Sequence, residues 1–140
     1  MASARFTRDE VILALDALYS SESEHLSADS KEMEELSALL TRLPIHPIEN
    51  RRKDFRTPTG IAAQLYRFQR ALLTGVNKNN VGLPFFDINY EFENRHNELH
   101  DIAAAIRRNE KHYAIDYGNR LEDYGFPEGI LLGHLHRVVE

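Results

Sequence analysis

The spacing of hydrophobic residues predicts that the chain begins with a helix. Thr7 and Glu10 form a capping-box pattern, in which a threonine at the N-cap is followed three residues later by a glutamate. The apolar residues after Thr7 recur at helical spacing and make one broad stripe. They are Val11, Ile12, Leu15, Leu18 and Tyr19. A first helix is therefore expected to start directly after Thr7.

A second helix is predicted from about Ser30 until Pro44 stops it, because apolar residues again recur at helical spacing there. These residues are Met33, Leu36, Leu40 and Leu43. The segment LPIHPIEN, which contains Pro44 and Pro47, is expected to be extended or turning.

A third helix is predicted to start at Pro58, a residue preferred at the first helical position, with Thr57 as N-cap. Its core face is expected to consist of Ile61, Leu65, Phe68 and Leu72. On this arrangement Arg67 and Arg70 point away from the core.

Residues 74–84 are rich in asparagine and glycine, which favours a loop or a short hairpin and disfavours a helix. The following segment, FFDINYEF, is expected to be a short strand or irregular. From about Glu93 the sequence is strongly helical, with a buried stripe of Leu99, Ile102, Ala103 and Ile106. A last helix is predicted to open at Pro127, with Ile130, Leu131, Leu135 and Val138 available for packing.

The predicted fold class is therefore mainly α: one compact domain, residues 1–140, of about five helices, with room for a short β-hairpin. The composition agrees, because 140 residues with 42% hydrophobic content suit a single core. The chain has no cysteine, which excludes disulfides and thiol chemistry. No apolar run approaches the roughly 20 residues of a membrane span, and the amino terminus lacks a signal-peptide pattern. We expect a soluble, cytoplasmic protein.

The charge is unevenly distributed along the chain. The formal net charge is −5. Residues 1–41 hold 3 basic and 9 acidic residues, residues 42–78 hold 8 and 2, and residues 79–140 hold 6 and 11. The central third is thus a basic region in an acidic protein, and clustering by chance on a mixed surface is the alternative interpretation.

This basic region leads into the third predicted helix, whose free N–H groups and dipole favour an anion. A DNA phosphate is the natural candidate. The residues expected to hold phosphates are Arg51, Arg52, Lys53, Arg56 and Thr57. In the following loop Lys78, Asn79 and Asn80 are suited to contacts with base edges in the major groove, and a solvated turn is the competing interpretation.

Catalytic patterns are weak in this sequence. His96 and His100 in HNELH are four residues apart, but the glutamate does not follow the first histidine as in zinc proteases, so a solvated helix face is preferred. The sequence contains no Gly-rich phosphate loop, nucleophile elbow or paired-aspartate metal site. We therefore expect a binding domain that is not an enzyme, with no metal and no cofactor.

Four segments, in this order, resemble the DNA sulfur-binding domain of McrA-type HNH restriction endonucleases. They are FTRDEVILALDALY, ELSALLTRLPIHP, FRTPTGIAAQLYRF and FPEGILLGHLHR. The resemblance extends over nearly the whole chain. It implies a mainly helical domain that recognises double-stranded DNA with a phosphorothioate in its backbone. The domain would act as the reading head of a type IV, modification-dependent restriction enzyme in bacterial defence, with an HNH nuclease domain in cis.

The same resemblance implies an apolar pocket for the sulfur atom, with walls formed by Tyr124, Phe126, Pro127 and Ile130. Sulfur is less strongly hydrated than oxygen, whereas oxygen in such a pocket would lose its water at a cost of roughly 1–3 kcal/mol. Without the resemblance, FPEG would be interpreted as a helix start with a buried phenylalanine. His46 would lie at the rim of the DNA site. The alternative function is a helical protein-interaction module whose basic region binds an acidic partner.

Overall fold

The described part of the chain is mainly helical. The computed structural model describes residues 5–21, 26–75 and 83–110. Its helices are α1 (Arg8–Ser20), α2 (Lys31–Arg42), α3 (Pro58–Thr74), α4 (Leu83–Glu91) and α5 (His96–Arg108), with one 3-10 turn, η1 (Ile48–Asn50). Within these ranges there is no strand. The predicted fold class, mainly α with about five helices, is confirmed.

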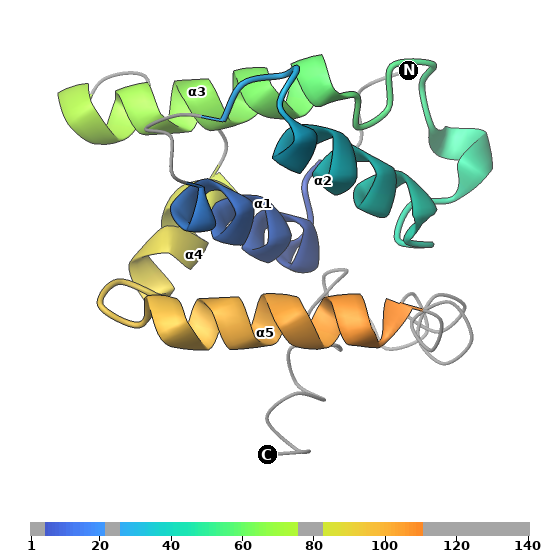
Figure 1. Cartoon of the computed structure of the whole chain (residues 1–140). Helices are drawn as coiled ribbons and strands as arrows, with labels where there is room; N and C mark the ends of the chain where they lie inside the picture. Colours follow the sequence, from blue (N-terminus) through green and yellow to red (C-terminus); the bar gives the residue numbers. More distant parts are fainter. Residues whose placement is uncertain (1–4, 22–25, 76–82, 111–140) are drawn as a thin grey trace.

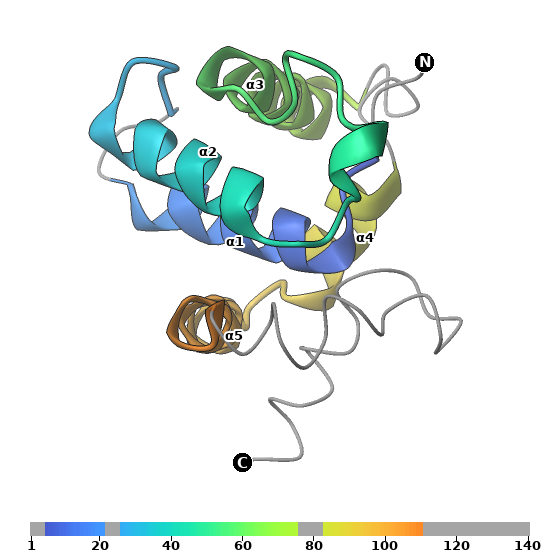
Figure 2. The same cartoon turned by 90° about the vertical axis from the view of Figure 1, so that its right-hand side faces the viewer.

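Helix α1 lies at the centre of the molecule and packs against each of the other four helices. Figures 1 and 2 show α3 on one side of α1 and α5 on the opposite side, with α2 and α4 flanking it. Residues 11–15 of α1 are fully buried. A helix that is apolar around most of its circumference is expected in such a central position. The outer helices α3 and α5 therefore present opposite faces of the protein.

The helix starts follow the signals in the sequence. At α1 the capping box is complete, because the Thr7 side chain accepts from the Glu10 N–H and the Glu10 side chain accepts from the Thr7 N–H. Ser30 caps α2 in the same way, accepting from the Met33 N–H. Thr57 caps α3, and Pro58 occupies its first turn. Gly75 ends α3 with a left-handed backbone, φ 71°, which glycine adopts without strain.

The prediction for FFDINYEF is wrong, because residues 85–91 of this segment belong to α4. Phe85, Ile88 and Phe92 are buried and lie three and four residues apart, which is helical spacing. The rings of Phe85 and Phe68 pack with their centroids 5.8 Å apart. Burial of this aromatic face outweighs the weak helix propensity of the segment. The loop predicted over residues 74–84 is wrong at both ends, since Thr74 belongs to α3 and residues 83 and 84 belong to α4.

Among the described residues, the predicted core positions are buried with two exceptions. All four predicted residues of α5 are buried, as are those of α2. Leu72 of α3 is 48% exposed and Tyr19 of α1 is 38% exposed. Periodicity gives the direction of a side chain but not whether another element covers it, and in α3 the buried residue of the last turns is Ala71. The helix predicted after Pro127 lies outside the described residues. No helix within the described ranges has the length and apolar character to cross a bilayer.

Candidate nucleic-acid interface

The guanidinium of Arg56 is buried in contact with Glu10 of α1. Arg56 Nε donates to Glu10 Oε2 at 2.5 Å and Arg56 Nη2 donates to Glu10 Oε1 at 3.0 Å. The side chains of Arg56 and Glu10 are 6% and 0% exposed. Arg56 Nη2 also donates to the carbonyl of Arg5, and the guanidinium lies over the ring of Phe6 at 4.0 Å. Arg56 is thus enclosed by the protein and does not face solvent, so its predicted phosphate contact requires revision.

His46 completes this cluster, with Nε2 lying 2.9 Å from Glu10 Oε1. Burial would raise the pKa of Glu10, but hydrogen bonds from His46 and Arg56 and their charges outweigh it and hold the pKa below its ordinary value. Glu10 is therefore ionised near neutral pH. A carboxylate can only accept, so this hydrogen bond requires the His46 tautomer in which Nε2 is the donor. His46 links the segment after α2 to the start of α1.

The backbone at Arg56 is held in an unusual conformation. Its φ is 49°, in the left-handed region that residues other than glycine rarely adopt. The Arg56 carbonyl accepts from the buried Ser37 hydroxyl of α2 at 2.7 Å. The next residue, Thr57, uses its hydroxyl to accept from the Gly60 N–H at 3.1 Å. These contacts fix the position at which α3 begins, which gives Thr57 a capping role.

Arg51 closes the segment that follows α2. It donates to the carbonyls of Thr41, Leu43 and His46, at 2.8, 3.2 and 3.0 Å. Its guanidinium also lies 4.6 Å from the centre of the Phe55 ring. An arginine that satisfies the last carbonyls of a helix stabilises the helix end. Arg51 therefore anchors the loop more than it offers a charge to a ligand.

Of the predicted phosphate-binding residues, Arg52 and Lys53 are exposed at the surface. Arg52 Nε lies 3.5 Å from Asp54 Oδ1, and the side chains of Arg52 and Asp54 are 49% and 68% exposed. Such an exposed pair is weak in water. Arg52 and Lys53 both lie in the turn that precedes α3. Lys78, Asn79 and Asn80 lie outside the described residues, as do Tyr124, Phe126, Pro127 and Ile130 of the predicted sulfur pocket.

Two arginines of α3 that the sequence placed away from the core, Arg67 and Arg70, are also exposed. Arg67 donates to Gln64 Oε1 at 3.5 Å, and Arg70 donates to the Tyr66 hydroxyl at 3.3 Å. No carboxylate of the described residues pairs with either arginine. Helix α3 contains no acidic residue at all. That absence of acid from a 17-residue helix is the signal by which the sequence could have identified this face.

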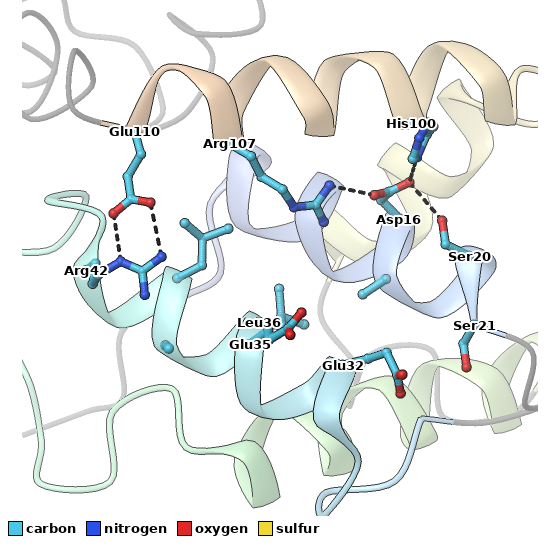
Figure 3. A pocket seen from close by; sticks show the side chains of 13 residues that line it. Asp16, Ser20, Ser21, Glu32, Glu35, Leu36, Arg42, His100, Arg107 and Glu110 are labelled. Atoms are coloured by element: carbon cyan, nitrogen blue, oxygen red, sulfur yellow. Dashed lines mark hydrogen bonds and ion pairs between the residues drawn. The ribbon is translucent and has the colours of Figure 1, made fainter.

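A second carboxylate–histidine–arginine cluster lies on the other side of α1, where Asp16 meets α5. His100 Nδ1 lies 2.8 Å from Asp16 Oδ1, and Arg107 Nη1 lies 3.0 Å from Asp16 Oδ2 (Figure 3). These residues line an open cavity of about 550 Å³ between α1, α2 and α5. Its other charged lining residues are Glu32, Glu35, Arg42 and Glu110, and Arg42 pairs with Glu110 at 2.7 Å. The lining carries more carboxylates than cations and does not suit a phosphate.

His96 and His100 do not converge on a shared site. The ring of His96 stacks on Tyr19, with centroids 4.4 Å apart and planes 13° apart, whereas His100 bonds to Asp16. Among the described residues there is no group of three histidine, aspartate or glutamate side chains arranged to hold a metal ion.

Comparison of the chain with protein-family models, with curated proteins and with solved structures found no match.

Proposed function

We propose that this chain is a non-catalytic DNA-binding domain that recognises phosphorothioate-modified double-stranded DNA, and that it serves as the reading head of a modification-dependent restriction enzyme. The observation that carries DNA binding is the concentration of exposed cations around α3. Arg52 and Lys53 precede the helix, where Asp54 lies beside Arg52, and Arg67 and Arg70 lie on the helix, which contains no acidic residue. The specificity for sulfur rests on the resemblance of the four sequence segments.

The charge distribution over the rest of the described surface supports this assignment. The exposed side of α2 carries Glu32, Glu34 and Glu35. DNA is therefore repelled from that side, and its approach is favoured at the α3 side, because attraction and repulsion both act during diffusional encounter. The net charge of −5 does not oppose this proposal, because among the described residues the exposed carboxylates of α2 and the exposed cations of α3 lie on different helices.

Arg51 and Arg56 have a different role in this proposal from the one that the sequence suggested. Both hold the segment between α2 and α3 in place through hydrogen bonds inside the protein. Substituting Arg56 would weaken binding to every duplex by disturbing the loop that presents Arg52 and Lys53. Such weakening would accompany a fall in stability, whereas removal of a residue that only binds a phosphate would leave stability unchanged.

The test is a competition between two duplexes of identical sequence, one of which carries a single backbone phosphorothioate. The thioated duplex is expected to compete at least an order of magnitude more effectively for the labelled thioated probe. Both stereoisomers should be measured separately, since a pocket of fixed shape accepts one better. If the plain and thioated duplexes bind equally well, the specificity for sulfur is lost but DNA binding stands. If neither binds, the whole proposal fails.

A second candidate function is a helical protein-interaction module that binds an acidic partner. The observation in its favour is the exposure of Leu72 and Leu73 on α3, at 48% and 86%. Contiguous exposed apolar side chains are more typical of protein interfaces than of phosphate contacts. In the competition experiment this candidate requires that neither duplex binds with appreciable affinity.

A further inference from the structure

The outward side of α3 is chemically distinct from the rest of the described surface. The buried stripe of the helix consists of Ile61, Leu65, Phe68 and Ala71. The opposite side carries Thr59, Ala63, Tyr66, Arg67, Arg70 and Leu73. Figures 1 and 2 show that α3 is an outer element, so this side faces away from the other helices. It offers an aromatic ring, two cations and short side chains, with no carboxylate.

The two arginines on this side lack the carboxylate partners that many other described arginines have. Arg8 pairs with Glu91 at 2.6 Å, and Arg107 pairs with Asp16 at 3.0 Å. Within the described ranges, Arg67 and Arg70 contact only neutral side chains. An exposed cation without a counter-charge attracts a polyanion more strongly than one already paired. The charge of these residues therefore favours a ligand with repeated negative charges.

The spacing of the basic residues along α3 matches the dimensions of a DNA groove. Arg52 and Lys53 lie before the first turn, and Arg67 and Arg70 follow Pro58 by nine and twelve residues. At a rise of about 1.5 Å per residue, Arg67 and Arg70 lie about 14–18 Å along the helix axis from Pro58, and Arg52 and Lys53 lie in the segment before Pro58. The major groove is about 12 Å wide and admits an α-helix of about 10–12 Å diameter. A helix whose first turn lies at one edge of that groove is therefore long enough to carry Arg67 and Arg70 to the other edge.

We propose that α3 enters the major groove, with Arg52 and Lys53 at the phosphates of one strand and Arg67 and Arg70 at those of the other. This assignment rests on the proposed function and adds the element and the groove. Tyr66 lies between the two basic groups along the helix, directed at the base edges. Arg70 lies 5.8 Å from the centre of the Tyr66 ring and donates to its hydroxyl, so the two side chains contact each other on the outward side of α3.

The short side chains in the first half of the outward face are consistent with close approach to DNA. Thr59 and Gly60 are exposed and Ala63 is partly exposed. A large or acidic side chain there would separate the helix from the groove floor or repel the phosphates. The position of Ala63, one turn before Tyr66 and Arg67, makes it the most sensitive site for a test substitution.

The experiment compares the parent with the double variant Arg67→Gln/Arg70→Gln and with Arg108→Gln as a matched control. Arg108 is an exposed arginine on α5, on the opposite side of the molecule. Affinity for a thioated duplex is measured over a range of salt concentrations. The slope of log K against log salt should fall by about 0.9 for each phosphate that the protein no longer neutralises, so by about 1.8 in the double variant. Affinity at low salt should fall roughly tenfold or more, and Arg108→Gln should behave as the parent.

Two further measurements identify the groove. Ala63→Glu places a carboxylate in the middle of the outward face, and since glutamate is a good helix former the variant should fold normally while binding is abolished. Bound parent protein should also protect guanine N7, which lies in the major groove, from methylation. Circular dichroism and thermal melting establish that each variant is folded.

The outcomes of these experiments distinguish a failure of the proposed function from a failure of the inference about α3. If the parent binds DNA and the double variant keeps the parent's affinity and salt slope, α3 is not the contact element, although the proposed function stands. Binding that leaves guanine N7 unprotected overturns the major-groove assignment. If polyglutamate competes as effectively as plain duplex for the protein, the surface fits an acidic polypeptide and the inference is wrong. A parent that binds no duplex removes both the proposed function and this inference.

Discussion

Helix α1 carries three acidic residues, and two of them, Glu10 and Asp16, are each bonded to one histidine and one arginine. The Glu10 cluster is buried, with His46 and Arg56 at 13% and 6% side-chain exposure. The Asp16 cluster opens into the cavity of Figure 3, with His100 and Arg107 at 60% and 40%. The two clusters have the same chemical composition but face different amounts of water. Burial, and not residue type, decides what each can contribute.

This difference in burial matters when basic residues in a sequence are counted as surface charges. The first cluster neutralises the charge of Arg56 inside the protein and fixes the turn that carries Arg52 and Lys53. The second leaves its histidine and arginine largely in contact with solvent. A buried charge that loses its partner costs several times more than an exposed one, because water cannot replace the partner. Substitutions should therefore act very unequally at the two clusters.

The largest difference is expected between Glu10→Gln and Asp16→Asn. Glutamine keeps the volume of Glu10 and can still complete the capping box, so this variant isolates the loss of charge beside Arg56. We expect the free energy of unfolding to fall by about 3–5 kcal/mol. Asp16→Asn should cost about 1 kcal/mol or less, because its cationic partners are exposed. Urea denaturation followed by circular dichroism measures both.

A double variant provides the control for Glu10→Gln. Replacing Arg56 by methionine in the same chain removes the unpaired cation, and exchange of a whole buried ion pair for neutral groups is often tolerated. Glu10→Gln/Arg56→Met should therefore be more stable than Glu10→Gln alone. Equal losses at Glu10 and Asp16, or no recovery in the double variant, would show that the buried pairing is not what stabilises the first cluster.

Lowering the pH is expected to have an intermediate effect on the stability of the folded protein. Because the pKa of Glu10 is lower in the folded protein than its ordinary value of 4.5, its contribution to stability is fully present above that pH. It is lost progressively as the pH falls below 4.5 toward the folded pKa, since the unfolded chain then binds more protons. Denaturation measured between neutral pH and about pH 3 should show this loss in the parent and in Asp16→Asn. Glu10→Gln should show a shallower dependence, and an identical dependence would contradict the assignment.

Most helices were predictable because their signals are local. The caps at Thr7, Ser30 and Thr57 and the apolar spacing of α1, α2, α3 and α5 act within one segment of chain. The exception is α4, whose propensity is weak and whose stability comes from packing Phe85 on Phe68, residues distant in sequence. The exposure of Leu72 was not predictable for a similar reason, because it depends on which part of α3 the other helices cover.

The location of the DNA site stays a prediction, and the structure shows that two of its predicted members, Arg51 and Arg56, bond to other groups of the protein. The sequence identified the basic region and the start of α3, and it placed Arg67 and Arg70 outside the core. It could not assign Arg56 to Glu10, because that pair joins residues 46 positions apart and forms only in the folded chain. Nor could it show that Arg51 would bond three carbonyls. A count along the sequence assigns such arginines to the surface charge, but in the folded chain they are bonded to other groups of the protein.

The smallest difference in stability is expected between substitutions of the two histidines. His46→Ala removes a hydrogen bond to a buried carboxylate, which also keeps its contacts with Arg56, so we expect a loss of about 1.5–3 kcal/mol. His100→Ala should change stability by no more than about 0.5 kcal/mol, because His100 is 60% exposed and Asp16 keeps Arg107 and Ser20 as donors. Thermal melting of both variants at neutral pH, with Asn109→Ala as an unrelated reference at the end of α5, measures the contrast. If His100→Ala destabilises the protein as much as His46→Ala, the Asp16 cluster is closed to water in solution, and the distinction between a buried and an open cluster on α1 is lost.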